Sequence, residues 1–262
     1  MRIAPQWELE LLSVRNLQCN FGGLAAVSDV SFDVAKGEFV GIIGPNGAGK
    51  TTLLNLITGY LKPSSGKILF LDRNIAGLRP YRVKRLKIAR TFQVVQPFNE
   101  MTVRENVLVG ARFGRGAWLS AGEINDDCSR ALELAGLSNT AGMLAGALTL
   151  GEKKRLELAR SLASRPTLLL LDEVMGGLSA GEIKELVRAL KRIHESGVTV
   201  VMIEHVLHAL FQLVDRVLVL DFGRKIGDGE PSKIMSQPDV VSSYLGRPLH
   251  ENESVHLTPR SN

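Results

Sequence analysis

The residues with the clearest chemistry run from Gly44 to Thr51 and read Gly-Pro-Asn-Gly-Ala-Gly-Lys-Thr. They match the pattern G-x-x-x-x-G-K-[ST], in which the backbone N–H groups of a glycine loop point at phosphates. We expect the Lys50 ammonium to reach the β- and γ-phosphates and the Thr51 hydroxyl to bind Mg²⁺. The nucleotide-binding residues predicted here are Gly44, Pro45, Asn46, Gly47, Ala48, Gly49, Lys50, Thr51 and Thr52.

The segments on both sides of this loop favour a binding site over the alternative, a glycine-rich turn that contains a lysine by chance. An apolar run at 38–43 precedes the loop and is typical of a buried parallel strand. A helical segment at 52–58 follows, and the N-terminus of such a helix adds a partial positive charge. Strand, loop and helix in this order predict binding of a nucleoside triphosphate.

Two carboxylates follow a second apolar run. Four leucines at 168–171 are followed directly by Asp172 and Glu173. Open α/β sheets place ligand chemistry at the carboxyl ends of their strands. We therefore expect Asp172 to hold Mg²⁺ through water, and Glu173 to be the general base for an attacking water. The alternative is that the acidic pair caps the next helix.

Composition and charge narrow the class of protein. The 262 residues carry a net charge of +5 and include two cysteines, Cys19 and Cys128, far apart and without metal-ligand spacing. That cysteine usage indicates a reducing compartment and argues against a structural metal site. The basic stretch 82–90 indicates a solvated helix face rather than a surface for nucleic acid or anionic lipid. Residues 1–10 lack the apolar core of a signal peptide, and the apolar windows are too short to span a bilayer. We expect a cytosolic protein unless a partner holds it at a membrane.

The periodic pattern predicts an α/β fold with a mainly parallel sheet, and the phosphate loop at 44–51 indicates a P-loop NTPase core. An N-terminal antiparallel β subdomain is expected over 11–34. Between about 94 and 165 the strand signals stop, which indicates an inserted helical lobe. The domain is expected to span 8–248, followed by a polar, flexible tail at 249–262. The other expected elements are strands at 67–71, 88–92, 167–171, 198–203, 216–220 and 225–226, and helices at 80–86, 103–111, 124–135, 152–163, 181–195 and 206–213.

These motifs, in this order, resemble the nucleotide-binding subunit of an ABC transporter over nearly the whole chain. The resemblance implies ATP and Mg²⁺ as cofactors and assigns further roles. Phe21 matches the aromatic that stacks on adenine, and Gln93 matches the glutamine that touches Mg²⁺ and senses the membrane partner. His205 matches the switch histidine on the γ-phosphate. Taken singly, Phe21 could be a core residue, Gln93 a surface residue, and His205 an ordinary residue at a strand end.

The stretch Leu148-Thr149-Leu150-Gly151-Glu152 resembles the family's signature sequence, Leu-Ser-Gly-Gly-Gln, with departures. Thr149 keeps the hydroxyl and Gly151 keeps the close backbone approach. Leu150 replaces a glycine, and Glu152 adds a negative charge that could weaken closure driven by ATP. Ser179 stands where the family often has aspartate. The resemblance implies that Thr149, Gly151 and Glu152 serve the nucleotide of an opposite subunit.

Several stretches narrow the resemblance to importers of branched-chain or other hydrophobic amino acids: 99–103, 171–178, 203–206 and 244–246. The family then implies a second cassette, identical or paralogous, membrane permeases and, indirectly, a solute-binding protein. It also implies a peripheral place on the cytoplasmic side of the inner membrane, with no nucleic acid. Phe98 and Met101 offer apolar anchors for a permease helix.

Two other interpretations stay open. One is a soluble ABC ATPase that acts on ribosomes or DNA, although such proteins usually carry two cassettes or a long coiled coil. The other is a regulatory subunit that binds ATP without hydrolysing it, because its signature departs from the common one. Intact Glu173 and His205 argue for hydrolysis.

Overall fold

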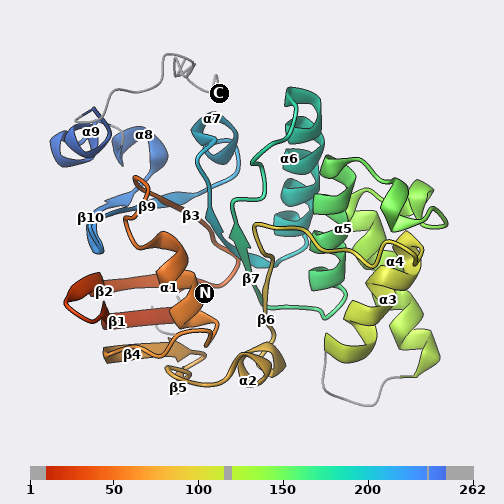
Figure 1. Ribbon diagram of the computed structural model, residues 1–262, viewed down its shortest axis with the longest axis horizontal. Coiled ribbons are helices and arrows are strands. Elements are labelled where there is room, and N and C mark those ends of the chain that lie inside the picture. The colour runs from red at the N-terminus through yellow and green to blue at the C-terminus, as the bar shows by residue number, and fades with distance from the viewer. Residues whose placement is uncertain (1–9, 115–119, 235, 246–262) are drawn as a thin grey trace, which may run out of the picture.

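The six-stranded sheet at the centre of the molecule is mainly parallel. The computed structural model describes residues 10–114, 120–234 and 236–245. The strand order is β10-β9-β3-β8-β7-β6; the β9–β10 pairing is antiparallel and the other pairings are parallel (Figure 1). The strands are β3 Phe39–Ile43, β6 Ile88–Arg90, β7 Leu168–Asp172, β8 Thr199–Ile203, β9 Arg216–Asp221 and β10 Arg224–Gly229. The mainly parallel sheet predicted from the apolar runs is confirmed.

Alternate residues of these strands enter two separate cores. Leu169 and Leu171 lie in the core shared with helices α5 (Leu150–Leu162) and α6 (Ala180–Glu195). Leu168 and Leu170 lie in the core shared with helix α1 (Lys50–Ile57). Successive side chains of a strand point to opposite faces, so a strand covered on both sides needs an uninterrupted apolar run. The four leucines of β7 meet that need, and α1 and α5 lie on opposite sides of the sheet (Figure 1).

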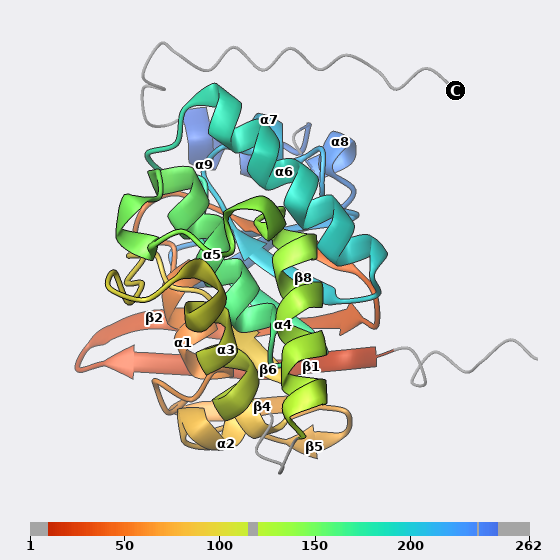
Figure 2. The ribbon, with the colours of Figure 1, turned by 90° about the vertical axis from the view of Figure 1, so that its right-hand side faces the viewer.

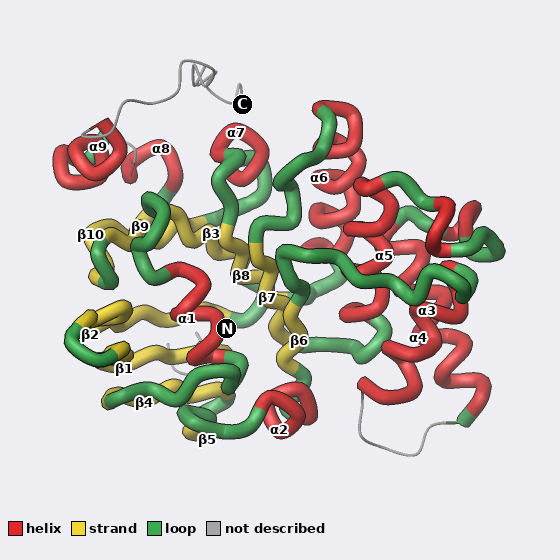
Figure 3. Tube along the Cα trace, viewed as in Figure 1, coloured by secondary structure: helices red, strands yellow, loops and turns green. Residues whose placement is uncertain are grey.

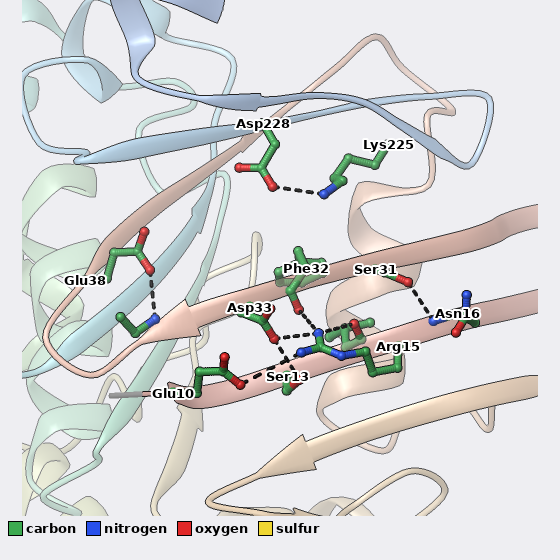
Figure 4. Close-up of polar contacts among 12 residues, drawn as sticks. Glu10, Ser13, Arg15, Asn16, Ser31, Phe32, Asp33, Glu38, Lys225 and Asp228 are labelled. Carbon is green, nitrogen blue, oxygen red and sulfur yellow. Dashed lines mark hydrogen bonds and ion pairs between the residues drawn. The ribbon is translucent and has the colours of Figure 1, made fainter. Parts of the chain in front are cut away.

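A second, antiparallel sheet shares the core of α1. Its strand order is β2-β1-β4-β5, and its bounds are β1 Glu10–Phe21, β2 Leu24–Ala35, β4 Ser65–Phe70 and β5 Arg73–Asn74. The predicted antiparallel β subdomain is confirmed, because β1 pairs antiparallel with β2 up to Phe21 opposite Leu24. Polar pairs cross this sheet: Asp33 accepts hydrogen bonds from the Ser13 hydroxyl at 2.7 Å and pairs with Arg15 at 2.5 Å (Figure 4).

A group of helices lies beyond β6 and β7, at the right of Figure 3. It contains α3 (Val103–Gly114), α4 (Ala121–Ala135) and α5, which contact one another (Figure 2). Among the described residues between 94 and 165, the β-structure is one isolated bridge, Thr102 to Leu144. The inserted helical lobe is therefore confirmed, while its limits at 94 and 165 and the domain limits at 8 and 248 stay predictions.

Three helices begin with the same local motif. In each, the N-cap hydroxyl accepts a hydrogen bond from the N3 backbone, and the N3 glutamate accepts one from the N-cap backbone. This capping box satisfies two of the N–H groups that a helix start leaves without partners. The pairs are Ser120–Glu123 on α4, Thr149–Glu152 on α5 and Ser179–Glu182 on α6.

Some elements differ from the prediction. The helix expected over 206–213 is only α7, Leu207–Leu210, and the chain continues in turns after Phe211. The strand expected at 88–92 ends at Arg90. Helix α2 (Pro80–Arg85) was expected; β5, α8 (Pro231–Ile234) and α9 (Pro238–Leu245) were not. The predicted tail at 249–262 lies outside the described residues. No helix in the described part of the chain is long and apolar enough to cross a membrane.

Candidate active site

The predicted phosphate loop connects β3 to α1 in a conformation that requires glycine. Gly49, the N-cap of α1, has a φ of 97°, and a Cβ there would lie 2.4 Å from the Ala26 carbonyl oxygen. A Cβ on Gly44 would lie 2.0 Å from the Leu220 oxygen. Such contacts exclude any side chain at either position. The loop is thus fixed by its fit against β2 and β9.

Lys50 begins α1, and its ammonium lies over the loop. The Nζ donates to the Gly44 oxygen at 2.7 Å and to the Pro45 oxygen at 2.9 Å, and the residue is buried. Burial lowers the pKa of Lys50, while the carboxylates of Glu173 and Asp172 oppose that shift. A buried ammonium held by carbonyl groups alone is a strong attractor for an anion.

The other residues predicted to bind nucleotide differ in how far they are exposed to solvent. Asn46, Gly47 and Thr51 are exposed, and Thr52 is partly buried. Ala48 is buried, and its carbonyl accepts the Gly223 N–H from the β9–β10 turn at 3.1 Å. The loop therefore has residues that pack against the protein and residues that face solvent.

Glu173, which follows β7, is held by two residues predicted to act with it. Its Oε1 lies 2.9 Å from His205 Nε2, and its Oε2 accepts the Gln93 Nε2–H at 2.8 Å. Its φ is +49°, in the left-handed region that side chains disfavour. Strained backbone of this kind collects at active sites. The structure thus brings together Gln93 after β6, Glu173 after β7 and His205 after β8.

Three residues predicted to hold metal line one cavity of about 900 Å³: Thr51, Gln93 and Asp172. They offer a hydroxyl, an amide and a carboxylate, and oxygen donors of this kind suit Mg²⁺. Within the described residues, no group of three His, Cys, Asp or Glu side chains could hold a metal ion. Mg²⁺ usually keeps several water ligands and takes others from phosphate, so three donors of this kind are enough to hold it.

The predicted signature lies elsewhere, at the start of α5. Thr149 caps that helix, and Glu152 returns its carboxylate to the Thr149 N–H at 2.9 Å. The Gly151 N–H donates to Glu182 of α6 at 3.0 Å. Thr149, Gly151 and Glu152 do not line the cavity that contains Thr51 and Asp172.

Phe21 ends β1, and 48% of its surface is exposed. The alternative that it is a core residue is therefore wrong. An exposed aromatic ring at a strand end is free to stack on a planar ligand.

Comparison with known proteins agrees with this geometry. Residues 27–176 match the family model described as ABC transporter. The chain belongs to the ABC transporter family. It is 39% identical to the high-affinity branched-chain amino acid transport ATP-binding protein LivG of Escherichia coli K12, over 90% of this chain and 98% of LivG. It is 36% identical to the corresponding protein BraF of Pseudomonas aeruginosa, with the same coverage.

Solved structures give the same result for the fold. The ADP conformation of the ATP-binding cassette MJ1267 superposes with a TM-score of 0.83 and 33% identity, over 91% of this chain and all of that one. A dimeric post-hydrolysis state of the cassette MJ0796, bound to ADP and phosphate, has a TM-score of 0.73 and 26% identity, over 84% and 99%. The chain is an ABC ATPase with the P-loop NTPase fold.

Two buried residues, Glu204 and Lys154, were not predicted from the sequence; they hydrogen-bond to the backbone near Glu173 and His205. Glu204 is buried and accepts the Met175 N–H at 2.7 Å and the His205 N–H at 3.2 Å. Burial raises the pKa of Glu204 and lowers that of Lys154. Lys154 of α5 donates to the Gly176 oxygen at 2.8 Å. The position of Glu204 beside His205 was the available signal; Lys154 had none, because a lysine in an amphipathic helix usually faces solvent.

The interpretation of 82–90 as a solvated basic face needs a correction. Arg82 and Arg85 of α2 are exposed, as expected. Arg90, at the end of β6, is not solvated: only 6% of its side chain is exposed, and it pairs with Asp172 at 2.8 Å. The stretch runs from a helix into a strand of the central sheet, so its last arginine enters the protein instead of continuing the exposed face.

Proposed function

We propose that this ABC ATPase hydrolyses Mg·ATP with Glu173 as the general base, and that it powers the import of branched-chain or other hydrophobic amino acids. The observation that carries the catalytic part is the Glu173 carboxylate, held at both oxygens by Gln93 and His205. An oriented carboxylate at the carboxyl edge of a parallel sheet can accept a proton from an attacking water.

The phosphates bind to the loop around Lys50. Its ammonium exchanges the carbonyl oxygens of Gly44 and Pro45 for phosphate oxygens, which form stronger, charge-assisted hydrogen bonds. The positive end of α1 and the loop N–H groups add to the attraction. Phe21 stacks on the adenine, and His205 contacts the γ-phosphate.

Thr51, Asp172 and Gln93 would hold Mg²⁺. When bound, it neutralises the charge that develops on the phosphates. The proposal is supported by the shared cavity and by the oxygen donors that these residues offer. Thr51 is exposed, so its hydroxyl is available to a ligand.

A second cassette completes the site. Thr149, Gly151 and Glu152 begin α5 away from the cavity, so they are suited to serve the nucleotide of an opposite subunit. The dimeric state of MJ0796 with ADP and phosphate supports this arrangement. Hydrolysis then removes the γ-phosphate that both subunits bind, and the dimer opens.

The transport role rests on the relatives named for branched-chain amino acid transport. Their names favour transport over action on ribosomes or DNA, and an intact Glu173 favours hydrolysis over a purely regulatory role. The chain would work with membrane permeases and a solute-binding protein, on the cytoplasmic side of the inner membrane. Phe92 and Phe113 are exposed and line the cavity, and Phe98 is exposed as well; these aromatic rings would contact a permease helix.

The decisive experiment reconstitutes the chain in liposomes with a second cassette and with permease subunits from the same organism. The expected result is ATP hydrolysis stimulated by binding protein loaded with leucine, together with leucine uptake. Stimulation by a different class of solute would overturn the amino acid assignment alone. Co-sedimentation with ribosomes, without any stimulation by binding protein and solute, would overturn transport.

A further inference from the structure

Arg90 connects the strand that leads to Gln93 with the strand that ends at Asp172. The two side chains are each 6% exposed, and Arg90 Nη2 donates to Asp172 Oδ2 at 2.8 Å. A buried carboxylate without a partner is strongly disfavoured, so this pair fixes the position of Asp172.

The other arm of the guanidinium reaches the phosphate-loop helix. Nη1 donates to Asn55 Oδ1 at 2.6 Å and to the Thr58 hydroxyl oxygen at 3.1 Å. Thr58 in turn donates to the Leu54 carbonyl at 2.6 Å. Arg90 therefore ties β7 to α1, the helix that begins with Lys50 and Thr51.

Two aromatic rings confine the guanidinium. Its Cζ lies 5.3 Å from the centre of Phe92 and 5.9 Å from the centre of Tyr60, within the range of cation–π attraction. Its Nε is buried and has no hydrogen-bond partner. The two terminal nitrogens of Arg90 thus bind Asp172 and Asn55, in an orientation that leaves Nε without a hydrogen bond.

The two oxygens of Asp172 are consequently different. Oδ2 is taken by Arg90, whereas Oδ1 receives no hydrogen bond from the described residues, and the residue lines the cavity with Thr51 and Gln93. We propose that Arg90 is a positioning residue: it orients the Asp172 carboxylate so that Oδ1 serves Mg²⁺ beside Thr51. This inference rests on the proposed function.

The test separates metal binding from nucleotide binding and from catalysis. Full-length wild type, Arg90→Gln and Arg90→Lys are titrated with ADP by calorimetry, first in EDTA and then over a range of Mg²⁺ concentrations. Mn²⁺ binding in the presence of ADP is followed by electron paramagnetic resonance. Loss of a residue that orients a metal ligand costs about 10–100-fold in metal affinity.

For Arg90→Gln we expect ADP affinity in EDTA within about twofold of wild type, because Lys50 and its loop are unchanged. The Mg²⁺ and Mn²⁺ concentrations for half-saturation should rise by about 10–100-fold. Arg90→Lys keeps the charge beside Asp172 but loses the fork to Asn55, so its rise should be smaller. Arg85→Gln, on the exposed face of α2, is the matched control and should leave both affinities unchanged.

If Arg90→Gln does not fold, Asn55→Ala replaces it. This change keeps the Arg90–Asp172 pair but removes one acceptor on α1, and it should raise the half-saturating Mg²⁺ concentration less than the loss of Arg90 would. Unchanged Mg²⁺ dependence in every folded variant would overturn the inference. An equal loss of ADP affinity with and without Mg²⁺ would do so too, since it would make Arg90 a support of the loop. Failure of wild type to bind ADP at all would overturn the proposed function instead.

Discussion

Two arginines, Arg216 and Arg90, connect the central sheet to other parts of the fold, and they differ in how completely the charged groups around them are paired. Arg216 of β9 pairs with Glu38 at 2.6 Å and with Asp228 at 2.7 Å, and it also donates to the Asp33 carbonyl. Burial lowers the pKa of Arg216, but these carboxylates outweigh burial and raise it. The Arg90 guanidinium pairs with one carboxylate, that of Asp172, and its Nε has no hydrogen-bond partner.

The carboxylates around Arg216 are used within the protein. Glu38 contacts Arg216 with both oxygens and also accepts the Ala35 N–H at 2.8 Å. Asp228 also accepts a hydrogen bond from Lys225 at 2.9 Å (Figure 4). Asp172 keeps one oxygen without a hydrogen bond from the described residues. Complete pairing indicates a structural role, because it leaves nothing for a ligand; incomplete pairing at the edge of a sheet indicates function.

The largest expected effect tests the functional side of this comparison. Glu173→Gln keeps the size of the side chain but removes the proton acceptor, so hydrolysis should fall by about 10²–10⁴-fold. The free energy of unfolding should change little, and ATP should still bind through Lys50. Steady-state hydrolysis and size-exclusion chromatography with Mg·ATP measure these outcomes.

In that variant the ATP-bound dimer should accumulate, because closure is intact and hydrolysis is blocked. Wild type should return to monomer as ATP is consumed. Lys50→Ala is the companion control: it should abolish nucleotide binding and therefore dimer formation. Hydrolysis by Glu173→Gln at the wild-type rate would remove Glu173 from catalysis.

Arg216→Ala tests the structural side and should have the opposite profile. Loss of charged hydrogen bonds to Glu38 and Asp228 should lower the free energy of unfolding by about 1.5–3 kcal/mol. The affinity of the remaining folded protein for ADP should stay near wild type, since Arg216 lies outside the cavity of Asp172. Urea denaturation and calorimetry measure the two quantities. A selective loss of ADP affinity without loss of stability would contradict the division between the two regions.

The same comparison explains what the sequence could and could not predict. The positions of Lys50, Asp172, Glu173 and His205 were predictable because an apolar strand precedes each of them, while their roles stay predictions. Arg90 was misinterpreted because its partner Asp172 is 82 residues away, and a basic stretch next to a short helix looks solvated. Glu204 and Lys154 were not predicted for the same reason, because the fold and not the spacing in the sequence determines their hydrogen-bond partners.

Secondary structure followed a similar rule. Long periodic segments such as α6 were predicted within one residue of their start, because the apolar face repeats over several turns. The short elements α7, α8 and β5 were shortened or missed, since two to four residues show no period.

A smaller effect is expected at Thr149, which caps helix α5 and is also proposed to contact the nucleotide of an opposite subunit. Thr149→Ala removes the N-cap of α5 and should lower the free energy of unfolding by about 1 kcal/mol. Ser120→Ala removes the same cap from α4 and is the matched control, with a similar loss of stability. Only Thr149→Ala should also slow hydrolysis in the assembled complex, with ATP binding by the isolated chain unchanged. Equal rates of hydrolysis by the two variants would show that Thr149 acts only as the N-cap of α5 and not in hydrolysis.

The smallest expected effect concerns Glu182, which links the caps of α5 and α6. The Ser179 N–H and hydroxyl, with the Gly151 N–H, hold the pKa of Glu182 at about 2, below its ordinary value of 4.5. A lowered pKa in the folded state means that the carboxylate stabilises the fold above pH 4.5 and that this contribution is lost as the pH falls toward 2. The difference in free energy of unfolding between wild type and Glu182→Gln should therefore be constant near neutral pH and shrink on acidification. Urea denaturation across this range measures it, and the shrinkage should be smaller in a Ser179→Ala background, which lacks the hydroxyl donor. A difference that stays flat down to pH 2 would show that the charge of Glu182 makes no contribution to the stability of the fold.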